Sequence, residues 1–200
     1  MDRKEELMTA MESLLPEQLS KSIRSITLHF EKHSKEIVHT FLEAFKKAVE
    51  QAAVLQDEKK KGKVRYILFS YLHSSIFLQR YLIRIDLMDH AFYSDSSQAV
   101  SYWDARDIYQ LFEGDVEAIR EELGKNYPRI REYEADYIRY AYAPYYHGVT
   151  KAFLQAMLEE ALPESNFLPQ QERLESFVSI LFGEYMGEAD ILFHIGEESI

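Results

Sequence analysis

The sequence predicts a predominantly α-helical protein: an irregular bundle of six or seven helices, with at most one short β-hairpin or extended segment near residues 80–93. Apolar residues recur at helical spacing over several long stretches. The 200 residues include only seven glycines and five prolines, and 46% are hydrophobic, which is ample for a packed core. This length fits a single helical domain over residues 1–200.

The first part of the chain predicts an unusually long helix. A short helix is expected to end near residue 14, before Pro16, which suits the first turn of the next one. The helical period then continues over residues 17–56, about 60 Å if straight. A compact chain of this size is only about 43 Å across. We therefore expect this helix either to break near His33 and Ser34 or to protrude and favour a dimer.

The middle of the chain is less clear. A lysine-rich turn around Gly62 separates the long helix from a helix expected over residues 64–79. The stretch 83–87 alternates between apolar and charged residues, as in a strand. A helical spacing fits residues 80–93 as well, so strand and helix both remain open there. The alternation slightly favours the extended form.

Three more helices are expected in the rest of the chain. Asp104 is a candidate N-cap and Gly124 a candidate C-cap for the first of them. The second contains Pro144, which removes a backbone hydrogen bond and clashes with the preceding turn. We expect this proline to interrupt the helix, which then continues to about residue 161. The last helix is expected over residues 170–194.

Composition weighs against several classes of function. A net charge of −11 opposes general nucleic-acid binding, which depends on neutralising phosphates. The lack of cysteine excludes a disulfide framework, cysteine-ligated zinc and a thiol nucleophile. No apolar run approaches the roughly 18 residues that a membrane span needs. The charged start of the sequence does not resemble a secretory signal. We therefore expect a cytoplasmic protein without membrane partners.

Residues 132–148 carry six tyrosines. A tyrosine combines a large apolar ring with one hydroxyl, which suits a partly wet boundary or a cavity with polar atoms. Packing at the edge of the core, a ligand cavity and a partner interface all fit, and aromatic stripes at helical spacing most often serve packing. If a ligand site exists, it is expected near the Pro144 kink. Its candidate residues are Tyr133, Tyr137, Tyr140, Tyr146 and His147.

One pattern could bind a metal ion. His29, His33 and Glu36 are spaced so that a helix can direct two imidazoles and a carboxylate to one side. That side lies about 100° from the centre of the apolar stripe, at the rate of 100° per residue. A solvated helix face is therefore favoured, and no metal or cofactor is expected.

These observations favour a non-enzymatic helical module that binds a small ligand or a protein partner and forms a homodimer. No set of catalytic residues is identified, because the sequence contains no Gly-x-Ser-x-Gly and no Gly-rich phosphate loop. Two alternatives remain open. One is a metal-dependent enzyme that uses His29, His33 and Glu36. The other is a scaffold or interaction protein without a cavity.

Overall fold

The protein has an α/β fold, so the predicted all-α bundle of six or seven helices is wrong. The computed structural model describes residues 3–127, 129–163 and 167–196, of which 57% are helical and 21% lie in a five-stranded mixed sheet. In chain order the elements are α1 (Arg3–Asp57), β1 (Val64–Tyr71), α2 (His73–Phe77), β2 (Leu82–Met88), η1 (Phe92–Ser94), β3 (Ala99–Asp104), α3 (Phe112–Gly124), α4 (Glu132–Ala161), η2 (Gln171–Arg173), β4 (Leu174–Glu184) and β5 (Ala189–Gly196).

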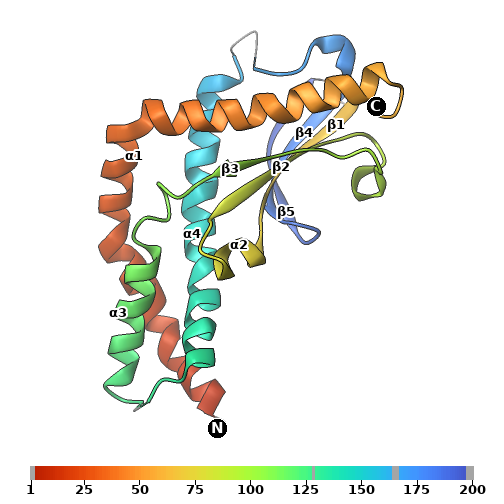
Figure 1. The fold of residues 1–200 in the computed structure, drawn as a ribbon. Helices are drawn as coiled ribbons and strands as arrows, with labels where there is room; N and C mark the ends of the chain where they lie inside the picture. The colour runs from red at the N-terminus through yellow and green to blue at the C-terminus, as the bar shows by residue number, and fades with distance from the viewer. Residues whose placement is uncertain (1–2, 128, 164–166, 197–200) are drawn as a thin grey trace.

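The sheet has the strand order β3-β2-β1-β4-β5. Strands β1 and β4 are parallel, and every other neighbouring pair is antiparallel. The extended segment favoured within residues 80–93 is present as β2. Figure 1 shows the sheet at one end of the molecule, while α3 and the first parts of α1 and α4 lie together at the other.

The helices predicted over residues 64–79 and 170–194 are wrong. Strand β1 and the short helix α2 occupy the first stretch, and the β4–β5 hairpin occupies most of the second. Strand β1 is buried on both faces. Its consecutive residues Leu68 and Phe69 point to opposite faces of the sheet, and neither has any exposed surface. Such a strand is apolar without alternation, and spacing alone cannot distinguish it from a buried helix.

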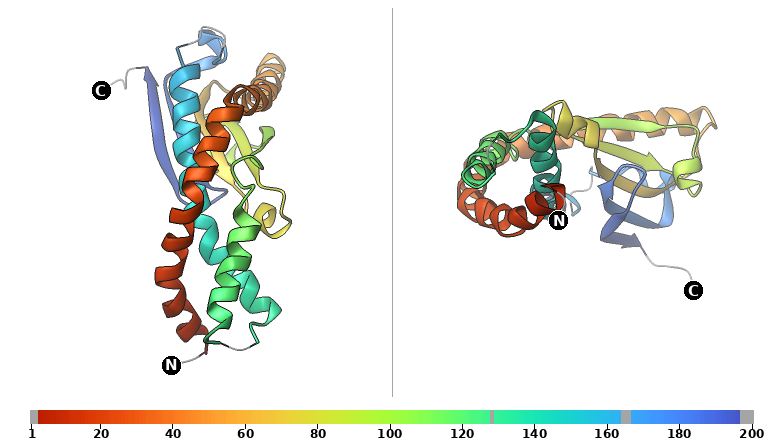
Figure 2. Two further views of the ribbon diagram at one scale, coloured as in Figure 1. Left: turned by 90° about the vertical axis from the view of Figure 1, so that its left-hand side faces the viewer. Right: turned by 90° about the horizontal axis from the view of Figure 1, so that it is seen from below.

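Helix α1 is continuous over 55 residues, including Pro16, and it turns sharply about half-way along its length (Figures 1 and 2). The expected break near His33 and Ser34 is absent, because both residues lie within the helix. The part of α1 before the bend, called here the first arm, and the part after it, the second arm, both pack against other elements. Residues of the first arm bond to α3 and α4. In the second arm, the Ala44 carbonyl accepts a hydrogen bond from Ser101 Oγ on β3, at 2.5 Å. The bend thus lets one long helix cover both halves of the molecule.

Helix α4 also differs from expectation at its proline. It is helical from Glu132 to Ala161 and continues through Pro144, so the predicted interruption is wrong and the predicted end is confirmed. Tyr142 and Tyr146 flank the proline and are completely buried. We attribute the continuity to this packing, which offsets the roughly 3 kcal/mol that an internal proline costs. Asp104 ends β3 instead of capping a helix, and Gly124 is the last residue of α3, with Lys125 and not Gly124 as the C-cap.

A buried carboxylate joins three helices. Asp115 of α3 is 4% exposed, and its Oδ1 accepts hydrogen bonds from Gln18 Nε2 at 2.8 Å and Ser22 Oγ at 2.6 Å. Its Oδ2 accepts from the hydroxyls of Tyr142 at 2.9 Å and Tyr146 at 2.7 Å. Four donors from α1 and α4 therefore replace the water that this carboxylate loses on burial. Burial and the bond to Asp115 raise the pKa of the Tyr146 hydroxyl, which keeps it a donor.

Removal of the Asp115 carboxylate should strongly destabilise the fold. Asp115→Ala leaves four donors without an acceptor, and we expect the free energy of unfolding to fall by about 3 kcal/mol or more. Tyr142→Phe and Tyr146→Phe should each cost about 1–3 kcal/mol, because each removes one hydrogen bond to a charged group. Urea denaturation measures these changes. The control Glu121→Ala removes an exposed carboxylate of α3 and should stay within about 0.5 kcal/mol. A loss below about 1 kcal/mol for Asp115→Ala contradicts this assignment.

Candidate functional site

The residues predicted to form one site lie in different surroundings. Tyr133 and Tyr137 are exposed and line a cavity at the start of α4. Tyr140 is 39% exposed, with its ring 6.1 Å from that of His73. Tyr146 is buried in the Asp115 network, and His147 lines a second cavity. From residue 133 to residue 147 the helix advances about 21 Å, which spreads these side chains along its length. The structure does not bring the five residues together.

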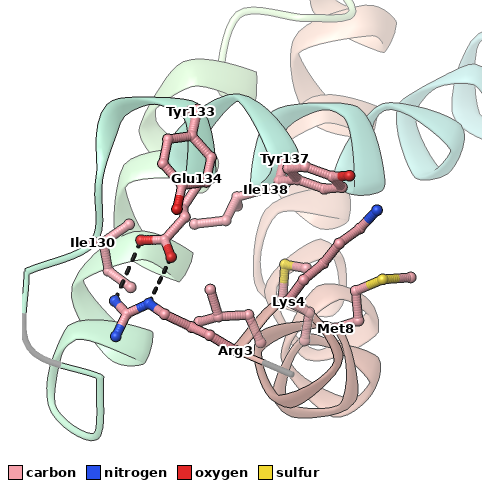
Figure 3. A pocket seen from close by; sticks show the side chains of 10 residues that line it. Arg3, Lys4, Met8, Ile130, Tyr133, Glu134, Tyr137 and Ile138 are labelled. Carbon is pink, nitrogen blue, oxygen red and sulfur yellow. Dashed lines mark hydrogen bonds and ion pairs between the residues drawn. The ribbon is translucent and has the colours of Figure 1, made fainter. Parts of the chain in front are cut away.

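The first cavity lies between the start of α1 and the start of α4 and has a volume of about 250 Å³ (Figure 3). Apolar side chains of both helices line it. Its charged groups already have partners: Arg3 Nε donates to Glu134 Oε1 at 2.6 Å, and Lys4 Nζ lies 4.7 Å from the centre of the Tyr137 ring. We therefore interpret this cavity as the loosely packed junction of two helix ends.

The second cavity, called here the His147 cavity, lies beside Pro144 of α4 and has a volume of about 400 Å³. Its lining includes Tyr71, His147, Gly148, Lys151, Glu188 and Asp190. Tyr71 and Glu184 are paired at the carboxyl ends of the parallel strands β1 and β4. The cavity therefore lies at the carboxyl ends of the one parallel strand pair of this sheet.

His147 is the unusual group of this cavity. It is only 6% exposed, and its ring stacks on that of Tyr71 with 3.7 Å between centroids. Its Nε2 is buried and has no hydrogen-bond partner among the described residues. Burial, assisted by the nearby charge of His73, lowers the pKa of His147 from 6.5 to about 3. The imidazole is therefore neutral near neutral pH, with one buried nitrogen unsatisfied. Native proteins usually satisfy such an atom with water or a ligand.

The edge of the His147 cavity carries several charges. Lys151 Nζ donates to Asp190 Oδ2 at 2.8 Å, and Glu188 is exposed beside them. Burial, and then the carboxylates of Glu184, Asp190 and Glu188, raise the pKa of the Tyr71 hydroxyl. Since Lys151 is paired, the remaining carboxylates make the surroundings of this hydroxyl negative.

Gly148 lines the cavity and, because it has no side chain, leaves space there. It lies inside α4, where glycine costs about 1 kcal/mol relative to alanine. A Cβ atom added there would meet no atom within 4 Å, so no close approach of another chain segment requires glycine. The sequence predicts His147 for a ligand site near Pro144 but does not point to Gly148. The ring of Tyr71, 76 positions before His147 in the sequence, is what completes this site.

The residues of the metal alternative do not form a cluster. The rings of His29 and His33 stack at 4.5 Å, and His29 Nε2 lies 3.0 Å from Asp107 Oδ1, while Glu36 is exposed. Across residues 3–127, 129–163 and 167–196, no group of three histidine or acidic side chains could hold a metal ion.

The sheet also contains a serine–histidine pair that was not expected from the sequence. Ser179 Oγ of β4 lies 3.2 Å from Nδ1 of His194 on β5, and His194 stacks on Phe177. In the described part of the chain, no carboxylate hydrogen bonds to His194, so the third group that orients a catalytic base is missing. The helix predicted over residues 170–194 would separate these two side chains, whereas the β4–β5 hairpin brings them together.

Comparison with protein-family models, with curated proteins and with solved structures finds no match to this chain. Among the described residues, no helix combines the length and the apolar character needed to cross a membrane.

The buried neutral His147 predicts a specific dependence of stability on pH. Between about pH 6.5 and pH 3 the unfolded chain binds a proton at this residue that the folded chain does not, so stability falls as the pH is lowered. The slope contributed by one such proton reaches about 1.4 kcal/mol per pH unit. His147→Phe should remove this contribution, and urea denaturation from about pH 7 to pH 4 measures it. The same change at the exposed His39 is the control. Equal slopes for wild type and His147→Phe contradict the assignment.

Proposed function

We propose that this protein is a non-enzymatic binding protein and that it binds a small molecule in the His147 cavity. One observation carries the proposal: the buried Nε2 of His147 has no partner among the described residues, although its side chain lines a cavity of about 400 Å³. A bound molecule with a matching polar group would supply that partner once the imidazole turns its Nε2 toward the cavity. The volume is within the roughly 300–1,000 Å³ typical of small-molecule sites.

Two consecutive residues of this cavity lower stability without a structural need. Gly148 weakens a helix in which nothing opposes a side chain, and His147 leaves a buried nitrogen unpaired. Such local conflicts with stability are concentrated at functional sites, where binding compensates for them. Stacking on Tyr71 keeps the imidazole beside the cavity. Of the residues predicted from the sequence, the proposed site includes His147 and does not include Tyr133, Tyr137, Tyr140 or Tyr146.

A homodimer in the cytoplasm is the second part of the proposal. Strand β5 is at an edge of the sheet, is rich in apolar residues and exposes 56% of Ile191. An edge of this kind readily pairs with another strand. At the opposite edge, Gln51 Oε1 accepts a hydrogen bond from the Val100 amide and so occupies part of β3. The lack of cysteine is in keeping with a reducing compartment.

Light scattering tests the assembly. Wild type should have the mass of a dimer at micromolar concentration, and Ile191→Lys should be monomeric because it places a charge on the edge that pairs. Tyr102→Lys, an equally exposed position on β3, is the control and should remain dimeric. A monomeric wild type rules out this part of the proposal and leaves the binding site unaffected.

A cavity-filling variant tests the binding site. Gly148→Leu should fold with normal or increased stability, because leucine is the better helix former, and it should obstruct the cavity. The matched control is Gly114→Leu in α3, where an added Cβ also meets no atom within 4 Å. In a thermal-shift screen of metabolites, the hits should raise the midpoint of wild type and Gly114→Leu by several degrees, as expected for ligands well above their Kd. They should not raise the midpoint of Gly148→Leu.

His147→Phe separates stability from binding. Without ligand it should be more stable than wild type by about 1 kcal/mol at neutral pH, because it keeps the stacked ring and removes the unpaired nitrogen. It should also lose the response to the hits. If a broad screen yields no hit, or if the hits stabilise Gly148→Leu as much as wild type, the proposal fails and a scaffold without a ligand is the better description.

A further inference from the structure

We infer that the ligand of the His147 cavity carries an ammonium group, as a small aliphatic amine or diamine does. This inference rests on the proposed function and adds the chemical class of the ligand. It is based on the balance of charge at the cavity, and the buried histidine that lines the cavity is compatible with it.

The charge balance at the cavity is negative. The carboxylates of Glu184, Glu188 and Asp190 all act on the Tyr71 hydroxyl. Two side chains offset them in part. Lys151 pairs with Asp190, and His73 Nε2 lies 2.8 Å from Glu184 Oε1.

Glu188 is the carboxylate of this group for which no ion pair is found among the described residues. A cationic ligand would pair with it, whereas an anionic ligand would meet repulsion from three carboxylates. Lys151 offers little to an anion while Asp190 occupies it. The net charge of −11 extends the same preference to the approach of the ligand from solution.

His147 is compatible with this class. A neutral imidazole has one nitrogen that donates and one that accepts a hydrogen bond. An ammonium group only donates, so it can use the accepting nitrogen without any change of protonation. The donating nitrogen could equally serve a carbonyl or a carboxylate, so the choice of ligand class follows from the carboxylates around the cavity.

Three probes of equal carbon length test the class. Isothermal titration of wild type with 1,4-diaminobutane, 1,4-butanediol and succinate compares a dication, a neutral molecule and a dianion on one four-carbon skeleton. We expect the diamine to bind at least about tenfold more tightly than the diol, and succinate not to bind. The affinity for the diamine should fall as salt is added, because part of it comes from exposed charges.

Three variants test whether the diamine binds in the His147 cavity. Glu188→Gln should weaken its binding by about two- to fivefold, as expected when one exposed ion pair is lost. Glu12→Gln is the matched control, since it makes the same change in net charge at an exposed residue of the first arm of α1. It should bind the diamine as wild type does. His147→Phe and Gly148→Leu should both lose the binding.

The possible failures are distinguishable. Tighter binding of the diol or of succinate overturns the inference on ligand class and leaves the proposed function intact. The inference is also overturned by no diamine binding at about 10 mM, or by binding that Glu188→Gln and His147→Phe leave unchanged. The second result places the diamine elsewhere on the acidic surface. The proposed function itself fails only in the metabolite screen, if no compound distinguishes wild type from Gly148→Leu.

Discussion

The carboxylate of Asp115 sets the arrangement of the helices on which the rest of the molecule depends. It accepts four hydrogen bonds, two from the first arm of α1 and two from tyrosines of α4. A buried charge is tolerated only when its lone pairs are satisfied, so α1, α3 and α4 must keep one relative position. The network also positions the candidate site. Tyr146 is held on Asp115, and the next residue, His147, is thereby directed to Tyr71 on the sheet.

Much of the helical structure could be predicted from local spacing, whereas most of the sheet could not. The helical period over residues 17–56, the helix end next to Gly124 and the end near residue 161 all correspond to real features. Strand β2 alternates and could be recognised, but β1 has neighbours on both faces and lacks alternation. Its nature is decided by pairing with β4, more than a hundred residues later in the chain. No local pattern contains that information.

The candidate site shows the same limit in its side chains. A helical projection groups Tyr133, Tyr137 and Tyr140, and the structure leaves all three exposed. The hydroxyls with a defined role belong to Tyr142 and Tyr146, because Asp115 on another helix accepts from them. A projection shows which side chains share a face of one helix, but it does not show what opposes that face. The partners of the tyrosines and of His147 come from α3 and β1, and only the tertiary structure identifies them.

The packing of the first arm of α1 has a consequence for how the chain folds. Arg3 pairs with Glu134, 131 residues later, and Gln18 bonds to a residue 97 positions away. Closing loops of this length costs entropy before any contact compensates for it, and folding is slow when such contacts dominate. During synthesis, the apolar side of this arm has no partner until α3 and α4 have been made. Strand β1 can pair with β4 only after an even longer stretch of chain has been synthesised, because β4 follows α4 in the sequence. A growing chain therefore exposes apolar surface and an unpaired strand edge for most of its synthesis. This is the condition under which chaperones protect nascent proteins from aggregation.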